Sequence, residues 1–255
     1  MLNGEEIKRL AAEKGCGFTI VTVEETGSTN DELKKLAAAG APHGYVLIAG
    51  KQTSGRGRMG HSFFSPVTGV YLSVLLRPHT PPEQTLHLTA AAGIAVCRAV
   101  ESLTDKKAQI KWVNDIYIEG RKVCGILTES ALSGGCTEWA VVGMGINVTE
   151  PRDGFPDDIR ERACALFRAE NETPPLFRER FAAELLSAFE RQTALPWEET
   201  LSEYRRRSYL TGKEVILSDG SRAEVTGISE SGSLTVMLDS GEIRDISSQF
   251  SVKEC

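Results

Sequence analysis

Hydrophobic positions recur at helical spacing in some stretches of the chain and form strand-like runs in others, a pattern typical of a mixed α/β protein. The predicted helices span residues 3–15, 28–40 and 84–103. Another follows Pro174-Pro175 and runs through Arg191, and two more are predicted to begin at Asp157 and Pro196. The predicted strands span residues 18–23, 45–49, 70–76, 108–112, 116–118, 123–129 and 138–148. Turn residues at 119–121 and 133–135 join neighbouring strands, so we expect a mixed, mainly antiparallel sheet flanked by helices.

After Thr211 the pattern changes to short alternating strands. These strands span residues 214–217, 222–228, 233–238 and 242–246, and glycine-containing turns separate them. Such a series predicts a small closed β-barrel. We therefore divide the chain into a larger α/β domain, residues 1–210, and a C-terminal barrel domain, residues 211–255.

Composition narrows the class of protein without identifying it. Of the 255 residues, 41% are hydrophobic and 25% are charged, as in an ordinary globular protein, and the net charge of −6 argues against a general nucleic-acid binder. No apolar run approaches the roughly 20 residues that cross a bilayer, and the start lacks a signal peptide's apolar centre, so we expect a cytoplasmic protein without membrane association. The six cysteines lack paired spacing, which predicts neither a zinc site nor a disulfide framework.

The segment between the predicted strands 45–49 and 70–76 is rich in glycine and arginine, with Gly55, Arg56, Gly57 and Arg58 in succession. Glycine amides and arginine side chains can surround a phosphate, and the loop is long enough to act as a lid. Its arginines have no obvious partners without a ligand, so we expect residues 53–66 to be mobile in the free protein. A basic loop that touches RNA is the alternative, although a single short copy in an acidic protein argues against it.

A second polar cluster, Ser28-Thr29-Asn30, stands at the start of the predicted helix 28–40. These residues can simply cap the helix, but free amides and small polar side chains at a helix N-terminus can also bind a neutral ring that carries a carbonyl group. Gln52, at the end of a predicted strand, offers a donor and an acceptor to the same ring, or else marks a solvated strand end.

Four motifs follow one another in a fixed order: Glu25 to Asn30, Gly50 to His61, Lys111 to Asp115, and Gly143 to Asn147. Together they closely resemble biotin–protein ligase. The resemblance implies an α/β ligase domain followed by an SH3-like barrel. It also implies that the enzyme activates biotin with ATP and Mg²⁺ to biotinyl-5′-AMP, with no fixed metal site in the protein, and transfers biotin to a lysine of the biotin carboxyl carrier protein of a carboxylase.

The same resemblance implies roles for individual residues. Biotin would contact Ser28, Thr29, Asn30, Gln52, Gly55, Arg56, Gly57, Arg58 and Lys111. The adenylate would contact Arg56, Arg58, Phe63, Lys111, Asn114 and Asn147. Arg58 and Lys111 would be catalytic, because a fixed cation between carboxylate and α-phosphate stabilises the charge that grows in the transition state.

Phe63, Asp115 and Lys122 are also candidates for the site. Phe63 stands where the family often has a tryptophan that covers the adenylate. Asp115 is a candidate for a nucleotide or structural contact. Lys122 is a second basic candidate near the site, with a solvated hairpin lysine as the alternative.

Some relatives of this type also repress genes through an N-terminal helix-turn-helix domain. Only residues 1–24 precede the first motif here, which predicts the monofunctional form without specific DNA binding. Homodimer formation through a sheet edge stays open. Two other functions also stay open: a lipoate or octanoate ligase or transferase of the same fold, and a non-catalytic biotin-sensing interaction module.

Overall fold

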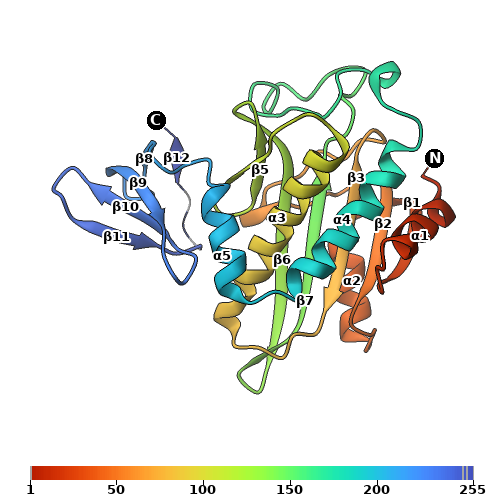
Figure 1. Ribbon diagram of the computed structural model, residues 1–255, viewed down its shortest axis with the longest axis horizontal. Coiled ribbons are helices and arrows are strands. Elements are labelled where there is room, and N and C mark those ends of the chain that lie inside the picture. Colours follow the sequence, from red (N-terminus) through yellow and green to blue (C-terminus); the bar gives the residue numbers. More distant parts are fainter. Residues whose placement is uncertain (1, 249, 251, 255) are drawn as a thin grey trace.

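A computed structural model describes residues 2–248, 250 and 252–254, and it contains two sheets (Figure 1). The larger is a seven-stranded mixed sheet in the order β1-β2-β3-β7-β6-β5-β4, in which only β1 and β2 are parallel. Its strands are β1 (Thr19–Thr26), β2 (Tyr45–Gln52), β3 (Val70–Leu76), β4 (Gln109–Lys111), β5 (Asp115–Ile118), β6 (Arg121–Ser133) and β7 (Cys136–Ile146). The predicted fold class, a mainly antiparallel sheet flanked by helices, is confirmed.

Helices cover the two faces of this sheet unequally (Figure 1). The helices are α1 (Gly4–Glu13), α2 (Thr29–Ala38), α3 (Thr85–Leu103), α4 (Phe177–Thr193) and α5 (Trp197–Arg206). The main hydrophobic core joins α1, α3, α4 and α5 to one face, whereas Leu33 and Ala37 of α2 pack with Leu47, Leu75 and Val141 on the other. Because α2 is short, part of that second face has no helix above it.

The prediction that a helix begins at Asp157 is wrong. Residues 157–162 form turns, with Ile159 and Arg160 both donating their backbone N–H to Pro156. Cys164 then donates its N–H to the carbonyl of Lys122, and Arg162 accepts the N–H of Lys122. Pairing with the β5–β6 hairpin satisfies the backbone groups that a helix would have used.

One helical segment, Pro82–Leu103, is long and apolar enough to cross a membrane by length and composition. It contradicts our expectation that no apolar run approaches that length. In the fold, 61% of its apolar window is buried, because α3 lies between the sheet and α4. Packing inside the protein therefore accounts for the hydrophobicity of this helix.

The smaller sheet is antiparallel, in the order β11-β10-β9-β8-β12. Its strands are β8 (Glu214–Ile216), β9 (Arg222–Ile228), β10 (Leu234–Leu238), β11 (Ile243–Ile246) and β12 (Lys253–Glu254). Within the described residues its edge strands β11 and β12 are not hydrogen-bonded to each other, so the predicted barrel is present as a five-stranded sheet. Trp112 donates its indole N–H to the carbonyl of Gly232 (3.0 Å), which fastens this sheet to the larger one.

Candidate active site

The candidate site lies on the face of the large sheet that α2 covers only in part. Side chains alternate across a sheet, so Ser73 of β3 and Gly143 of β7, which pair in register, face the N-terminus of α2. Gly145 lies two residues further along β7, and Gly125 pairs with it from β6. These three glycines, Gly125, Gly143 and Gly145, form a floor without side chains beyond the end of α2, and we call them the glycine floor.

The predicted polar cluster stands at one end of this floor. Ser28 is the N-cap of α2 and accepts the N–H of Asp31 (3.4 Å), as the capping pattern predicts. Thr29 donates both its backbone N–H (2.8 Å) and its hydroxyl (3.1 Å) to Oε1 of Gln52, whose Nε2 donates to the hydroxyl of Ser65 (3.0 Å). Gln52 therefore bridges the helix N-terminus and the loop that leaves β2.

Asn30 projects from the same turn across β7. Its Oδ1 accepts from the hydroxyl of Ser73 (2.6 Å), and its Nδ2 donates to the carbonyl of Leu127 (3.2 Å) and to Glu129 (3.0 Å). A Cβ atom added at Gly143 would lie 2.1 Å from Oδ1 of Asn30, which no real structure tolerates. Gly143 is thus required for Asn30 to reach this position.

Phe63 covers the floor from the glycine–arginine loop, residues 53–66. Its ring is so close to Gly145 that an added Cβ would lie 2.6 Å from it, and its N–H donates to the carbonyl of Gly55 (2.8 Å). Only a recess of about 20 Å³ is left beneath it, bordered by Ser28, Thr29, Asn30 and Gln52 together with Arg56 and Phe63. Gly55 is not among the residues that line the recess or the cavity. It is buried, and an added side chain there would meet Phe63 and Ser65.

Both arginines of the loop have partners among the described residues, so the expectation that they have no partners without a ligand is wrong. Arg56 pairs with Asp31 (2.5 Å), which also sits in the first turn of α2, and lies 3.4 Å from Glu129. Its hydrogen bond with Asp31 raises the pKa of Arg56. Arg58 donates to Oδ1 of Asn114 (3.1 Å) and to the carbonyl of Ser248, and burial lowers the pKa of its guanidinium.

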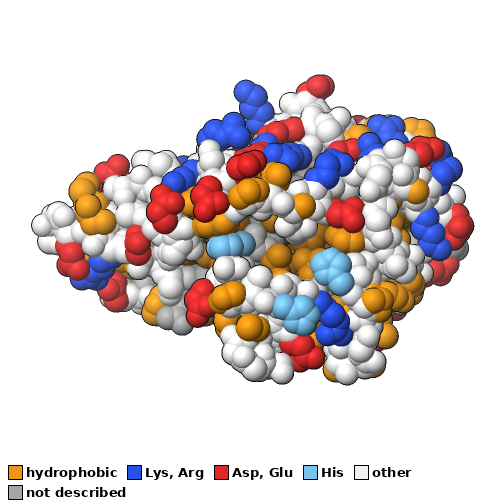
Figure 2. All heavy atoms as spheres, turned by 60° about the horizontal axis from the view of Figure 1, so that its bottom comes forward, with side chains coloured by type: hydrophobic (Ala, Val, Ile, Leu, Met, Phe, Trp, Pro, Cys, Tyr) orange, Lys and Arg blue, Asp and Glu red, His pale blue; other side chains and the backbone are white. Residues whose placement is uncertain are grey.

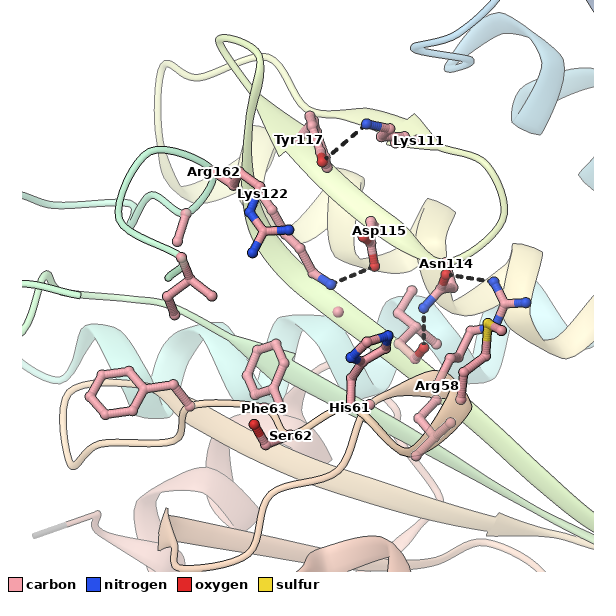
Figure 3. A pocket seen from close by; sticks show the side chains of 18 of the residues that line it. Arg58, His61, Ser62, Phe63, Lys111, Asn114, Asp115, Tyr117, Lys122 and Arg162 are labelled. Atoms are coloured by element: carbon pink, nitrogen blue, oxygen red, sulfur yellow. Dashed lines mark hydrogen bonds and ion pairs between the residues drawn. The ribbon is translucent and has the colours of Figure 1, made fainter. Parts of the chain in front are cut away.

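A cavity of about 670 Å³ opens beside the recess (Figure 3). This volume is in the range of pockets that bind small molecules. Predicted site residues that line the cavity are Arg56, Gly57, Arg58, Phe63, Lys111, Asn114, Asp115, Lys122 and Asn147. Arg56 and Phe63 border both spaces, so the recess and the cavity form one continuous site.

The two lysines of the site occupy different surroundings. Lys122 pairs with Asp115 (2.7 Å between Nζ and Oδ1), lies 5.9 Å from the centre of the Phe63 ring, and borders Gly125. Lys111 points away from this group toward Tyr117, as Figure 3 shows, with its Nζ 3.4 Å from the phenol oxygen. Lys122, and not Lys111, therefore lies where the recess meets the cavity.

Several lining residues were not predicted from the sequence. They include Tyr117, Phe155, Arg162, Phe250, Val252, Lys253 and Glu254. Tyr117 follows Asp115 by two positions on β5, so strand alternation could have identified it. Nothing in the sequence pattern indicates that residues 155–163, 250 and 252–254 line the cavity.

Histidine and metal chemistry have little support in the described residues. Figure 2 shows the end of the molecule that lies at the bottom of Figure 1, where histidine side chains gather beside hydrophobic ones. Of the four histidines, only His61 lines the cavity. Within the part of the chain that the structure describes, no group of three or more His, Cys, Asp or Glu side chains could hold a metal ion. Cations and amides, rather than a nucleophile–base pair, dominate the site.

Comparisons with known proteins agree with this architecture. The sequence profile of the biotin/lipoate A/B protein ligase family matches residues 23–147. The biotin–[acetyl-CoA-carboxylase] ligase of Mycobacterium tuberculosis is 32% identical over 242 residues, which cover 87% of this chain and 86% of that protein. The bifunctional ligase/repressor BirA of Bacillus spizizenii is 36% identical over 172 residues, which cover 67% of this chain but only 53% of that protein. The chain thus spans about half the length of this bifunctional relative.

Among solved structures, biotin protein ligase from Aquifex aeolicus, in complex with biotin and ATP, superimposes with a TM-score of 0.75. The two chains are 28% identical, and the match covers 93% of this chain and 99% of the other. The relative from M. tuberculosis shares enough identity over nearly the whole of both chains to settle the family. This chain belongs to the biotin/lipoate A/B protein ligase family.

Proposed function

We propose that this protein joins biotin and ATP to form biotinyl-5′-AMP and pyrophosphate, and then transfers biotin to a lysine of a carrier protein. The observation that carries the proposal is the junction between the polar recess and the cation-lined cavity over the glycine floor. One ring-shaped ligand and one nucleotide can meet there with their reacting groups side by side. The named biotin ligases of similar sequence and fold support the same assignment.

The recess suits a small ring that carries a urea group. Thr29, Asn30 and Gln52 there offer hydroxyl and amide groups, which can exchange their present mutual hydrogen bonds for bonds to the ligand. At about 20 Å³ the recess is too small for a bicyclic ring while Phe63 lies on the floor. Binding therefore requires that Phe63 and its loop move away from Gly145, and we propose that the ring then packs on the ligand.

In the first step, a carboxylate oxygen of biotin attacks the α-phosphorus of ATP, and the bond to the bridging oxygen of pyrophosphate breaks. Two anions must approach, so a fixed cation between them lowers the barrier. Lys122 lies at the junction and Arg58 on the adjacent loop, and we assign the charge stabilisation to both. Mg²⁺ would arrive with ATP as part of the substrate. Lys111, which the motif marks as catalytic, is assigned to the nucleotide side of the cavity with Asn114 and Asn147.

In the second step, an uncharged ε-amine of the carrier lysine attacks the acyl carbon, AMP leaves, and the amine releases its proton to solvent. Met59 of the loop lines the cavity and is 71% exposed, and we propose that the incoming lysine reaches the junction past this residue. A biotin carboxyl carrier domain is the proposed acceptor. The proposed cellular location is the cytoplasm. Light scattering would test whether the protein forms a homodimer. Fluorescence anisotropy would test the prediction that it does not bind DNA specifically.

Biotin-dependent release of pyrophosphate from ATP by the full chain is the decisive measurement. We expect release only when biotin is present, and transfer of label to an added biotin carboxyl carrier domain. Lipoate should compete poorly, because its dithiolane ring has no N–H or carbonyl group to use the hydrogen bonds that the recess offers. Preference for lipoate or octanoate would favour the alternative ligase, and biotin binding without any pyrophosphate release would favour a non-catalytic sensor.

A further inference from the structure

Strands β2 and β3 separate at the two ends of the glycine–arginine loop. Their pairing stops at Ala49 and Tyr71, beyond which β2 continues along β1 while the chain before β3 turns away. Gly50 and Gly69 lie just past the last pair, one on each strand end. We call the place where these two strand ends diverge the fork. The carbonyls that face this fork need donors other than the β2–β3 ladder.

Arg178 supplies those donors from the first turn of α4. Its Nε donates to the carbonyl of Gly69 (2.8 Å) and its Nη2 to the carbonyl of Gly50 (3.3 Å). Burial lowers the pKa of the guanidinium, and no carboxylate of the described residues lies within ion-pair distance of it. Arg178 is half-buried, and a partly desolvated cation that bonds only to backbone carbonyls costs more free energy than an apolar side chain in the same place.

The surroundings of the fork leave little freedom to shift. A Cβ atom added at Gly69 would lie 2.1 Å from the phenol oxygen of Tyr71, and one added at Gly50 would lie 2.9 Å from the carbonyl oxygen of Glu24. Tyr71 also donates its hydroxyl to the carbonyl of Pro66 (2.7 Å), within the same loop end. The planar guanidinium of Arg178 therefore fixes the separation of two closely packed strand ends.

We infer that Arg178 is a positioning residue for ligand binding, although it lies outside both the recess and the cavity. Gln52 follows Gly50 by two residues, and Ser65, its hydrogen-bond partner, precedes Gly69 by four. Holding the fork closed keeps Gln52 aligned with Thr29 and keeps the loop seated over the glycine floor. The ligand in question is biotin, so this part of the inference rests on the proposed function.

The test compares Arg178→Met with Arg180→Met in the full chain. Arg180 lies on the same helix, is exposed, and makes no side-chain hydrogen bond or ion pair within the described structure. Arg178→Met should raise the KM for biotin roughly 10- to 100-fold, as expected for losing hydrogen bonds from a charged donor, while kcat changes less than about threefold. Trypsin should cut the ligand-free loop after Arg56 or Arg58 about tenfold faster. Arg178→Lys should restore part of both effects, and Arg180→Met should behave as the parent.

Three outcomes would overturn the inference. One is an Arg178→Met protein that is folded and has an unchanged KM and cleavage rate. Another is a loss of kcat and melting temperature with no selective change in KM, which would mean a general structural role. The third is an Arg178→Lys protein that is as defective as Arg178→Met.

If Arg178→Met fails to fold, the same measurements on Arg178→Lys and on Tyr71→Phe, which loosens the same loop end, decide the question. If the parent protein itself shows no biotin-dependent pyrophosphate release, the proposed function fails, while the cleavage rates still decide whether Arg178 holds the loop.

Discussion

At the scale of single residues, two lysines with the same charge are expected to matter differently. Lys122→Met should slow single-turnover formation of the adenylate by roughly 10²- to 10³-fold, the cost of one preorganised electrostatic contact, because Lys122 stands at the junction of recess and cavity. Lys111→Met should act mainly on the KM for ATP, because Lys111 is held by Tyr117 and Glu254. Rapid-quench assays measure the rate of adenylate formation in each variant. An equal loss of this rate in both variants would show that Lys111 also acts on the reacting groups.

Gly143 gives a second prediction at this scale. Gly143→Ala places a methyl group where Asn30 Oδ1 now lies, so it should displace Asn30 and raise the Kd for biotin by about 10-fold or more. Gly227→Ala in β9 is the matched control, since an added Cβ there meets nothing within 4 Å. Calorimetric titration measures both. Unchanged biotin affinity in a folded Gly143→Ala protein would remove Asn30 from the recess.

The roles of residues that depend on their sequence neighbours were predictable. The roles of residues that depend on contact with a segment far away in the sequence were not. Ser28 was identifiable as a cap and Gln52 as a strand end from their neighbours alone. Lys122 looks like any solvated hairpin lysine until the hairpin folds against the loop that carries Phe63. Arg178 is one of several charged residues in an amphipathic helix, and only the fork between β2 and β3 distinguishes it.

At the scale of elements, the glycine–arginine loop is tied to α2 by the ion pair of Arg56 with Asp31. Asp31→Asn weakens that tie, so trypsin should cut after Arg56 several-fold faster in the ligand-free protein. Because the pair is partly exposed, added salt should accelerate cleavage of the parent protein and have less effect on the variant. Glu32→Gln serves as the control, since Glu32 pairs with Lys35 on the outer side of the same helix. Identical cleavage of all three proteins would show that the ion pair does not hold the loop.

Elements with a continuous hydrophobic period were predicted within a few residues of their ends, including α3, α4 and the strands of both sheets apart from β12, which was not predicted. The segment after Pro156 had two acidic residues and a proline to suggest a helix, and Ile159, Ala163 and Leu166 stand at helical spacing within it. The hairpin at Lys122 nevertheless provides the competing hydrogen bonds. A short helical pattern is therefore a weak predictor of a helix where a distant strand can pair with the same backbone.

At the scale of the whole molecule, the C-terminal sheet contributes residues 250 and 252–254 to the cavity. Buried side chains of the sheet, such as Val215 and Val225, belong to the same hydrophobic core as the larger sheet. Glu254 joins the two parts by pairing with Lys213 (2.7 Å) and Lys111 (3.6 Å). Division of the chain at residue 210 stays a prediction, and removal of residues 211–255 should expose core surface as well as open the cavity.

The ion pairs of Glu254 predict a pH dependence. Burial alone would raise the pKa of Glu254, but the hydrogen bond and charge of Lys213, with the charge of Lys111, outweigh it and hold the pKa below its usual 4.5. The stabilisation is therefore complete above that value and is lost as pH falls through the lower, folded-state pKa. When the pH is lowered from 6 to 3.5, the melting temperature of the parent protein should fall further than that of the Glu254→Gln variant. Parallel curves for the two proteins would show that Glu254 does not help to hold the sheet.

The apolar helix α3 also constrains how the chain can be made. Its cover on one side is α4, which spans Phe177–Thr193, whereas α3 itself is complete at Leu103. At ~5–20 residues per second, a ribosome needs on the order of ten seconds to synthesise the missing cover. During that interval the nascent chain carries, without this cover, a segment that is long and apolar enough by composition to cross a membrane. The core around α3 can therefore close only after α4 has been synthesised.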